Sequence, residues 1–123
     1  MAKILVIDDD PGFRKMISLT LTRAQHRVIE AQDGNEGVRR FKADRPDLVI
    51  SDIVMPEKEG IETIIEIRTM SPAIPIIAMS GGSANLGTQY LEVAGKLGAN
   101  AILSKPFRSA DLLELVNKML ADR

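Results

Sequence analysis

Five short apolar runs alternate with amphipathic stretches along the chain, and this alternation leaves few folds open to it. The runs occupy residues 4–7, 27–31, 47–50, 75–79 and 101–103. Continuous apolar runs rich in Ile and Val are typical of parallel strands that are buried on both faces. The second run is more polar than the others and the fifth is short, so we expect both to be edge strands.

The stretches between and after these runs carry apolar residues three and four positions apart, which predicts amphipathic helices. The five patterns consist of Phe13, Met16, Ile17, Leu21 and Ala24; Val38 and Phe41, in the weaker stretch 34–43; Ile61, Ile64 and Ile65; Tyr90, Leu91, Ala94 and Leu97; and Leu112, Leu113, Val116, Met119 and Leu120. Local signals agree, because Pro11 can begin the first helix and Asp33 can cap the second. We therefore expect five helices.

Strands that alternate with helices predict a parallel sheet with helices on both faces. Right-handed crossovers limit the topologies, and placing the two least apolar strands at the edges favours the order 2-1-3-4-5. This is the flavodoxin-like, doubly wound α/β fold with a five-stranded sheet. The 123 residues have the size of one domain, and no repeat or linker divides them, so we expect a single domain over residues 1–123.

Composition excludes several classes of site and partner. The chain has no Cys and one His, which excludes disulfides, thiolate chemistry and zinc sites built from Cys or clustered His. With 16 Lys and Arg against 17 Asp and Glu, the net charge of −1 argues against direct nucleic-acid binding. No apolar run approaches the roughly 18 residues of a membrane span, and the first run is too short for a signal peptide. We therefore expect a cytoplasmic protein without membrane contact.

Polar side chains follow four of the five predicted strands at the point where each strand ends. They are Asp8, Asp9 and Asp10 after the first strand, Asp52 after the third, Ser80 after the fourth and Lys105 after the fifth. In the predicted fold, ligands bind outside the carboxyl ends of the strands, at the switch point between the first and third strands. These residues are therefore the candidate functional site.

The residue types in this set point to phosphoryl chemistry. Two unit charges roughly 4 Å apart repel by about 4 kcal/mol at an effective dielectric near 20, so clustered carboxylates favour a bound cation. Mg²⁺ takes carboxylate and phosphate oxygens as ligands. A hydroxyl, an ammonium and the backbone N–H groups of Gly81 and Gly82 suit an anion with several oxygens, and an Asp can serve as the nucleophile.

Each of these residues also has a plainer interpretation when it is taken alone. Residues 8–10 can simply cap the first helix, Asp52 can be a turn residue, and Lys105 can be solvated. Only the complete series, which reads acid, acid, hydroxyl and ammonium at consecutive strand ends, favours a site. The basic stretch on the second helix, with Arg39, Arg40, Lys42 and Arg45, likewise fits a solvated face better than a binding patch.

The chain resembles the receiver domain of two-component response regulators, in particular the stand-alone chemotaxis type. The resemblance covers the whole chain and depends on residues 6–10, 50–56, Gly60, 77–80 and 104–107. It implies that Asp52 accepts a phosphoryl group from a phosphohistidine on a sensor histidine kinase or a histidine phosphotransfer protein. It also implies that the protein is a switch and not an enzyme acting on other substrates.

The resemblance assigns a role to each member of the set. Asp9 would bind Mg²⁺ directly, Asp8 would assist, and Asp52 and the backbone carbonyl of Val54 would complete the protein ligands. Asp10 has no role in the family and is predicted to start the first helix.

The resemblance also assigns the anion-binding groups. Ser80 would hydrogen-bond a phosphoryl oxygen and Lys105 would form an ion pair with it. The Lys105–Pro106 peptide would be cis. A shift of Ser80 would move the following loop and change the face formed by the fourth helix, fifth strand and fifth helix, which is the expected output surface for an unknown partner or a separate effector domain.

Three departures from the family pattern bear on the switch. Ile102 stands where members often carry Tyr or Phe, which puts the aromatic part of the usual switch in doubt. The segment from Ser80 to Lys105 is about three residues longer than in the chemotaxis type and includes Tyr90, which suits a partner contact or the core. Val54 stands where a polar residue is frequent.

Other classes fit the sequence less well. A phosphohydrolase of the haloacid-dehalogenase type would use Asp8 and Asp10, but it leaves Asp52 without a purpose and lacks an acidic pair after Lys105. A degenerate receiver that only binds protein would lack the acceptor or the lysine, and both are present. Nucleotide binding is disfavoured because no phosphate-binding glycine motif occurs. His26 is predicted to lie far from the carboxyl ends and so not to be the phosphodonor.

Overall fold

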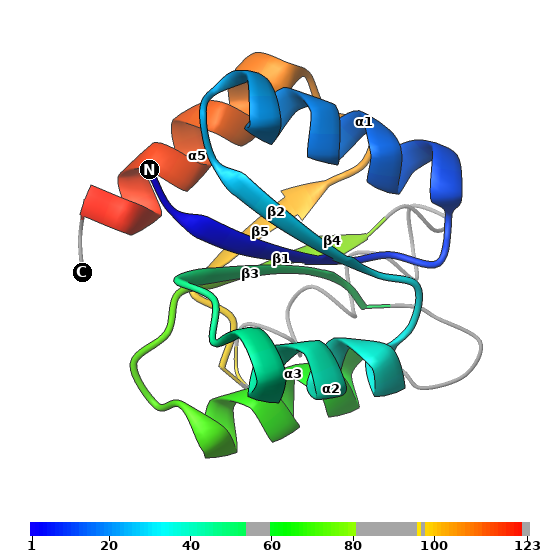
Figure 1. The fold of residues 1–123 in the computed structure, drawn as a ribbon, viewed down its shortest axis with the longest axis vertical. Coiled ribbons are helices and arrows are strands. Elements are labelled where there is room, and N and C mark those ends of the chain that lie inside the picture. The colour runs from blue at the N-terminus through cyan, green and yellow to red at the C-terminus, as the bar shows by residue number, and fades with distance from the viewer. Residues whose placement is uncertain (54–59, 81–95, 97, 122–123) are drawn as a thin grey trace.

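The structure, a computed structural model, describes residues 1–53, 60–80, 96 and 98–121. A parallel sheet of five strands has the order β2-β1-β3-β4-β5, as the sequence predicts (Figure 1). The strands are β1 (Lys3–Ile7), β2 (Arg27–Ala31), β3 (Leu48–Asp52), β4 (Ile76–Ser80) and β5 (Ala101–Ser104). The two strands predicted to be edges, β2 and β5, are the edges of the sheet.

The helices cover both faces of this sheet (Figure 1). They are α1 (Pro11–Arg23), α2 (Gly34–Asp44), α3 (Gly60–Met70) and α5 (Ser109–Ala121). Helices α1 and α5 lie on one face, and α2 and α3 lie on the other. The described residues thus contain four of the five predicted helices, and the pattern from Tyr90 to Leu97 falls outside them, except for a single helical residue, Lys96.

Burial on both faces explains why the central strands are continuously apolar. Successive side chains of a strand point to opposite faces of the sheet. In β1, Leu5 and Ile7 therefore pack toward α2 and α3, whereas Ile4 and Val6 pack toward α1 and α5. All residues of β3 and β4 are buried, and the edge strands keep partly exposed positions.

Helix starts follow the local sequence signals. The Asp10 carboxylate accepts hydrogen bonds from the backbone N–H groups of Gly12 and Phe13, at 3.0 and 3.2 Å, and so caps α1 in the role predicted for it. Asp33 caps α2 by accepting from the backbone N–H of Glu36 at 2.8 Å. Within the described part of the chain, no helix is long and apolar enough to cross a membrane.

Candidate functional site

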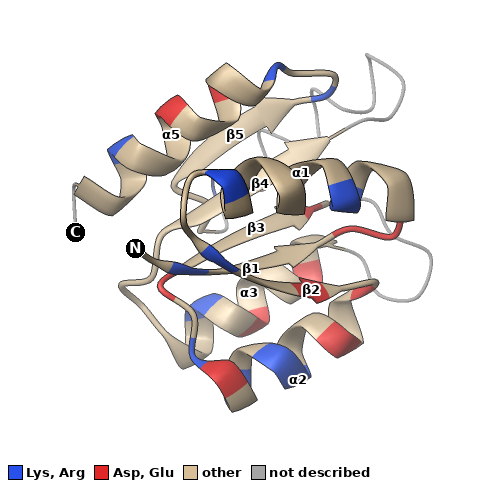
Figure 2. Cartoon of the chain, turned by 45° about the horizontal axis from the view of Figure 1, so that its top comes forward, with Lys and Arg blue, Asp and Glu red and all other residues tan. Residues whose placement is uncertain are grey.

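The three acids predicted to cluster do come together at the carboxyl end of the sheet. Strands β1 and β3 pair so that Ile7 lies beside Ser51, which places the next residues, Asp8 and Asp52, side by side. One carboxylate oxygen each of Asp8, Asp9 and Asp52 lies within 4.8 Å of the others. Figure 2 shows the acidic turn that follows β1, before α1 begins. This set of oxygen donors matches the ligands that a hard divalent cation prefers.

Burial divides the cluster into an enclosed side and an open side. Asp8 and Asp52 are buried, with 0 % and 5 % of their surfaces exposed, whereas Asp9 is exposed. Two buried carboxylates this close together are costly unless a cation or donor groups compensate their charges. An ion that enters from the side of Asp9 would reach all three oxygens.

Lys105 supplies part of this compensation. Its Nζ lies 2.7 Å from Oδ2 of Asp8 and 3.0 Å from Oδ2 of Asp52, so one ammonium bridges both buried acids. Burial by itself lowers the pKa of Lys105, but the hydrogen bond to Asp8 and the charges of Asp52 and Asp8 outweigh it, and the pKa is raised. The lysine is therefore held in its charged form.

An aromatic ring also contacts this lysine. Nζ of Lys105 lies 4.3 Å from the centroid of the Phe13 ring, in a cation–π contact. Phe13 in turn packs edge-to-face on Phe107, with ring centroids 5.3 Å apart and an interplanar angle of 86°. The Lys105–Pro106 peptide is cis, as expected.

Ser80 contributes a hydroxyl with unused hydrogen-bonding capacity. Ser80 ends β4, which lies between β3, the strand that ends in Asp52, and β5, the strand that Lys105 follows. The side-chain oxygen of Ser80 is buried. Among the residues that the structure describes, this oxygen has no hydrogen-bond partner. Leaving a buried polar group unpaired costs about 1–3 kcal/mol, so a ligand oxygen at this position would remove a real penalty.

Arg14 and Gly60 position the backbone of the two buried acids. Nη1 of Arg14 donates to the carbonyl oxygen of Asp8 at 2.6 Å, and its Nε pairs with Glu30 at 2.9 Å. A Cβ at Gly60 would overlap the carbonyl oxygen of Asp52, so only glycine lets the start of α3 approach the end of β3 this closely.

Comparisons with known proteins agree with this geometry. The family model of the response regulator receiver domain matches residues 4–117. The protein belongs to this family. The chemotaxis protein CheY of Thermotoga maritima is 36% identical over 119 residues, which cover 95% of this chain and 96% of that protein. The chain is thus a response regulator receiver domain of two-component signalling.

Longer relatives also contain this receiver domain. The transcriptional regulatory protein GlrR of Escherichia coli is 33% identical over 119 residues, and the match spans 97% of this chain but 26% of GlrR. Among solved structures, CheY4 of Vibrio cholerae has a TM-score of 0.87 at 33% identity and covers 98% of this chain. The receiver domain of NtrX from Brucella abortus has a TM-score of 0.90 at 25% identity.

Of the other residues singled out in the sequence, the structure describes only some. Val54, Gly81, Gly82 and Tyr90 lie outside the described residues of the receiver domain. Ile102 is described and is 41% exposed on β5.

The single His of the chain, His26, is far from the site. His26 lies at the other end of the sheet, where its Nδ1 accepts a hydrogen bond from the backbone N–H of Ala2 at 3.2 Å. Its predicted position away from the carboxyl ends of the strands is confirmed, and the expectation that it is not the phosphodonor stays a prediction.

Sequence patterns missed the residues that support the site. Periodicity marks Phe13 only as an apolar position of α1, no sequence signal points to Arg14, and Gly60 is indicated only by the family resemblance. The phosphohydrolase alternative loses support, because its second acid, Asp10, is exposed and occupied as the α1 cap while Asp52 joins the cluster.

Proposed function

We propose that this receiver domain is a phosphorylation-activated switch in which Asp52 accepts a phosphoryl group from a phosphohistidine. The donor would be a sensor histidine kinase or a histidine phosphotransfer protein. The observation that carries the proposal is the placement of the Asp52 carboxylate beside two further acids and a bridging lysine, with an unpaired buried hydroxyl at the end of the neighbouring strand. These are the groups that receive a phosphoryl anion and balance its charge.

The acidic cluster is proposed to hold Mg²⁺ through the carboxylates of Asp8, Asp9 and Asp52. The backbone carbonyl of Val54 stays a predicted fourth ligand. When bound, the ion supplies positive charge that offsets the repulsion between these acids and an incoming phosphoryl group. The fit depends on three carboxylate oxygens in reach of one another and on the exposed side at Asp9.

The transfer step involves the side chain of Asp52. A carboxylate oxygen of Asp52 forms the new bond to phosphorus as the P–N bond of the donor breaks, and the electron pair of that bond stays on the imidazole nitrogen. Lys105, which contacts the Asp52 carboxylate at 3.0 Å, then pairs with the phosphoryl oxygens. The Ser80 hydroxyl donates the hydrogen bond that it does not make in the present structure. Hydrolysis by water restores the carboxylate and releases phosphate, so the protein acts only on its own acceptor.

The output is proposed to pass through β4 and β5. The backbone N–H of Lys105 donates to the carbonyl oxygen of Ser80 at 2.8 Å. Because this hydrogen bond joins the two backbones, a displacement of either residue would displace the other. Because Ile102 lacks an aromatic ring, the switch would depend on Ser80 and Lys105. An unknown output protein or effector domain would detect the change. The cytoplasmic location and the absence of direct nucleic-acid or membrane binding stay predictions.

The test uses two small phosphodonors with Mg²⁺. Acetyl phosphate and phosphoramidate, which contains the P–N bond of phosphohistidine, are incubated with the protein, and intact mass is measured. We expect one added phosphoryl group in the wild type and in Asp10→Asn, a matched control outside the acid cluster, and none in Asp52→Asn. Phosphate release that survives Asp52→Asn but disappears in Asp8→Asn would overturn the proposal in favour of a phosphohydrolase.

A further inference from the structure

A cavity of about 710 Å³ lies at the end of the sheet opposite the acid cluster. It opens where α2 and α3 end, close to the turns that lead into β3 and β4. The lining residues are Phe41, Lys42, Arg45, Pro46, Met70, Ser71, Ala73 and Ile74. Cavities of roughly 300–1,000 Å³ are typical of small-molecule sites. None of these residues takes part in the proposed phosphoryl transfer.

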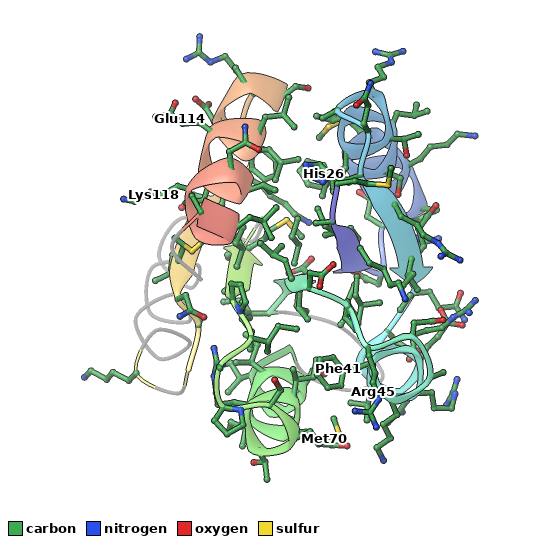
Figure 3. All side chains as sticks on the ribbon, turned by 60° about the vertical axis from the view of Figure 1, so that its left-hand side comes forward. His26, Phe41, Arg45, Met70, Glu114 and Lys118 are labelled. Atoms are coloured by element: carbon green, nitrogen blue, oxygen red, sulfur yellow. The ribbon has the colours of Figure 1, made fainter. Side chains whose placement is uncertain are left out.

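The floor of the cavity is apolar. Phe41 and Ile74 are 8 % and 6 % exposed, and Met70, at 36 %, closes the side toward α3. Figure 3 shows Phe41 on α2, Arg45 directly after that helix and Met70 on α3 gathered between the ends of the two helices. An apolar body placed against these side chains would be removed from water, which is favourable in proportion to the apolar area covered.

Hydrogen bonds hold one wall of the cavity in place. The Arg68 guanidinium donates to the carbonyl oxygens of Ser71, Pro72 and Ile74, at 3.2, 3.0 and 2.7 Å. It also donates to the carbonyl oxygen of Gly98 at 2.6 Å, which ties the wall to the segment before β5. The cavity is therefore shaped before any ligand arrives, and binding need not order this wall.

The polar rim carries positive charge only. Lys42 and Arg45 line the cavity, and no carboxylate is among the described lining residues. Within the described part of the chain neither cation forms an ion pair, whereas Arg40 on α2 pairs with Asp44. An adjoining hollow is also lined by Lys42 and Met70, and it holds two acids of α3, Glu62 and Glu66. An anionic group is therefore attracted by Lys42 and Arg45 at the α2 side of the cavity, whereas the acids of α3 would repel it.

We propose that this cavity binds a small amphipathic anion, a carboxylate with an alkyl or aryl body. The carboxylate lies at Lys42 and Arg45, and the apolar body lies on Phe41, Met70 and Ile74. The site is independent of phosphorylation at Asp52, because it uses other residues at the opposite end of the strands. It also gives a role to Lys42 and Arg45, two members of the basic stretch that the sequence alone assigned to solvent.

The test is a titration of the ¹⁵N-labelled protein with octanoate, followed by amide chemical shifts. We expect saturable shifts at residues 41–46 and 70–74. The neutral analogue octan-1-ol and the cation octylammonium have the same alkyl chain and should bind more weakly, each by about tenfold or more, because they lack the charge that the rim matches. Equal binding of all three, or shifts that do not saturate, would overturn the proposal.

Variants separate the cavity from unspecific attraction. The double substitution Lys42→Gln and Arg45→Gln should weaken octanoate binding about tenfold. The matched double substitution Lys15→Gln and Arg23→Gln removes the same charge from a different hollow beside α1 and should leave it unchanged. Equal weakening in both doubles would show that net charge alone attracts the probe and would overturn the proposal.

A filling variant tests the apolar part. Ala73 is exposed at the cavity, so Ala73→Trp should fill it without disturbing the core and abolish the octanoate shifts. Acetyl phosphate should still modify Asp52 in this variant, which keeps a failure here distinct from a failure of the proposed switch. Unchanged octanoate binding in Ala73→Trp would contradict the proposal. So would self-association of the wild type that Ala73→Trp removes, because a second copy would then occupy the cavity.

Discussion

Two partly buried cations, Lys105 and Arg68, organise opposite ends of the sheet in different ways. Lys105 bridges two carboxylates, Asp8 and Asp52, at distances of 2.7 and 3.0 Å. Arg68 has carbonyl oxygens and the Asn100 side chain as partners, and all of these are neutral. Accordingly the pKa of Lys105 is raised despite its burial, while burial lowers the pKa of Arg68.

The difference separates an exchangeable contact from a structural one. A cation bound by anions can change partners when a metal ion or phosphoryl group enters, because the new species competes for the same charges. A guanidinium that satisfies several carbonyl oxygens joins backbone segments in one geometry, since its planar donors match only that arrangement. We therefore expect the contacts of Lys105 to change when a metal ion or phosphoryl group binds, and the contacts of Arg68 to stay the same.

The largest effect is expected for Lys105→Met measured without divalent cations. The substitution leaves Asp8 and Asp52 buried together without their bridging ammonium, and loss of one partner from a buried ion pair costs about 3–5 kcal/mol. The free energy of unfolding, from urea denaturation, should fall by about 3 kcal/mol. Adding Mg²⁺ should recover part of this loss.

Lys118→Met, at an exposed position of α5, is the matched control and should change little. A loss in Lys105→Met that Mg²⁺ leaves untouched would break the distinction, because the carboxylates would then not be accessible to an ion.

Arg68→Ala is expected to have the second largest effect. It removes six hydrogen bonds that end on the backbone of Ser71, Pro72, Ile74 and Gly98 and on Asn100. Water can replace the partners only at the exposed carbonyls, so unfolding free energy should fall by about 2 kcal/mol.

Arg68→Lys should recover less than half of this loss, since an ammonium lacks the planar fork. Mg²⁺ should not change the loss in either variant, and Arg39→Ala on exposed α2 serves as the control. Full recovery in Arg68→Lys would mean that charge, and not geometry, is what the carbonyls require.

A smaller effect is expected for Phe13→Leu, which sharpens the account of Lys105. Leucine keeps an apolar contact at α1 but removes the ring that lies 4.3 Å from Nζ and packs on Phe107. Stability should fall by about 1 kcal/mol. The ε-methylene protons of Lys105 should also lose the upfield NMR shift caused by the ring, and Phe13→Tyr should retain it. A shift that is the same in all three proteins would rule out the ring as a positioning group for the lysine.

The smallest effect concerns pH and His26. Burial, and then the positive charge of the N-terminus, lower the pKa of His26 below its ordinary value of 6.5. Between the two values the unfolded chain binds a proton that the folded chain does not, so stability declines as pH falls through this window. His26→Gln should remove that part of the decline in urea unfolding measured from pH 7.5 to pH 5. An unchanged slope would contradict the shift.

The sequence by itself determined the order of the sheet and most members of the site. Apolar runs and helical periodicity are local signals, and a doubly wound topology brings the ends of the strands to one edge whatever their loops do. Asp8, Asp9, Asp52, Ser80 and Lys105 could thus be grouped without coordinates. Asp10 as a helix cap also followed from local chemistry, because a cap bonds to residues two and three positions away.

Only the tertiary structure decided which groups meet across the fold. Lys105 and Asp8 are 97 positions apart, and Arg68 and Gly98 are 30 apart, so no local pattern encodes either contact. Phe13 shows the same limit, since periodicity marks it as an apolar position of α1 without indicating that its ring faces an ammonium. The cavity over Phe41 likewise exists only because the ends of two helices and one turn enclose it. Such features depend on packing at ångström scale, which a one-dimensional pattern does not contain.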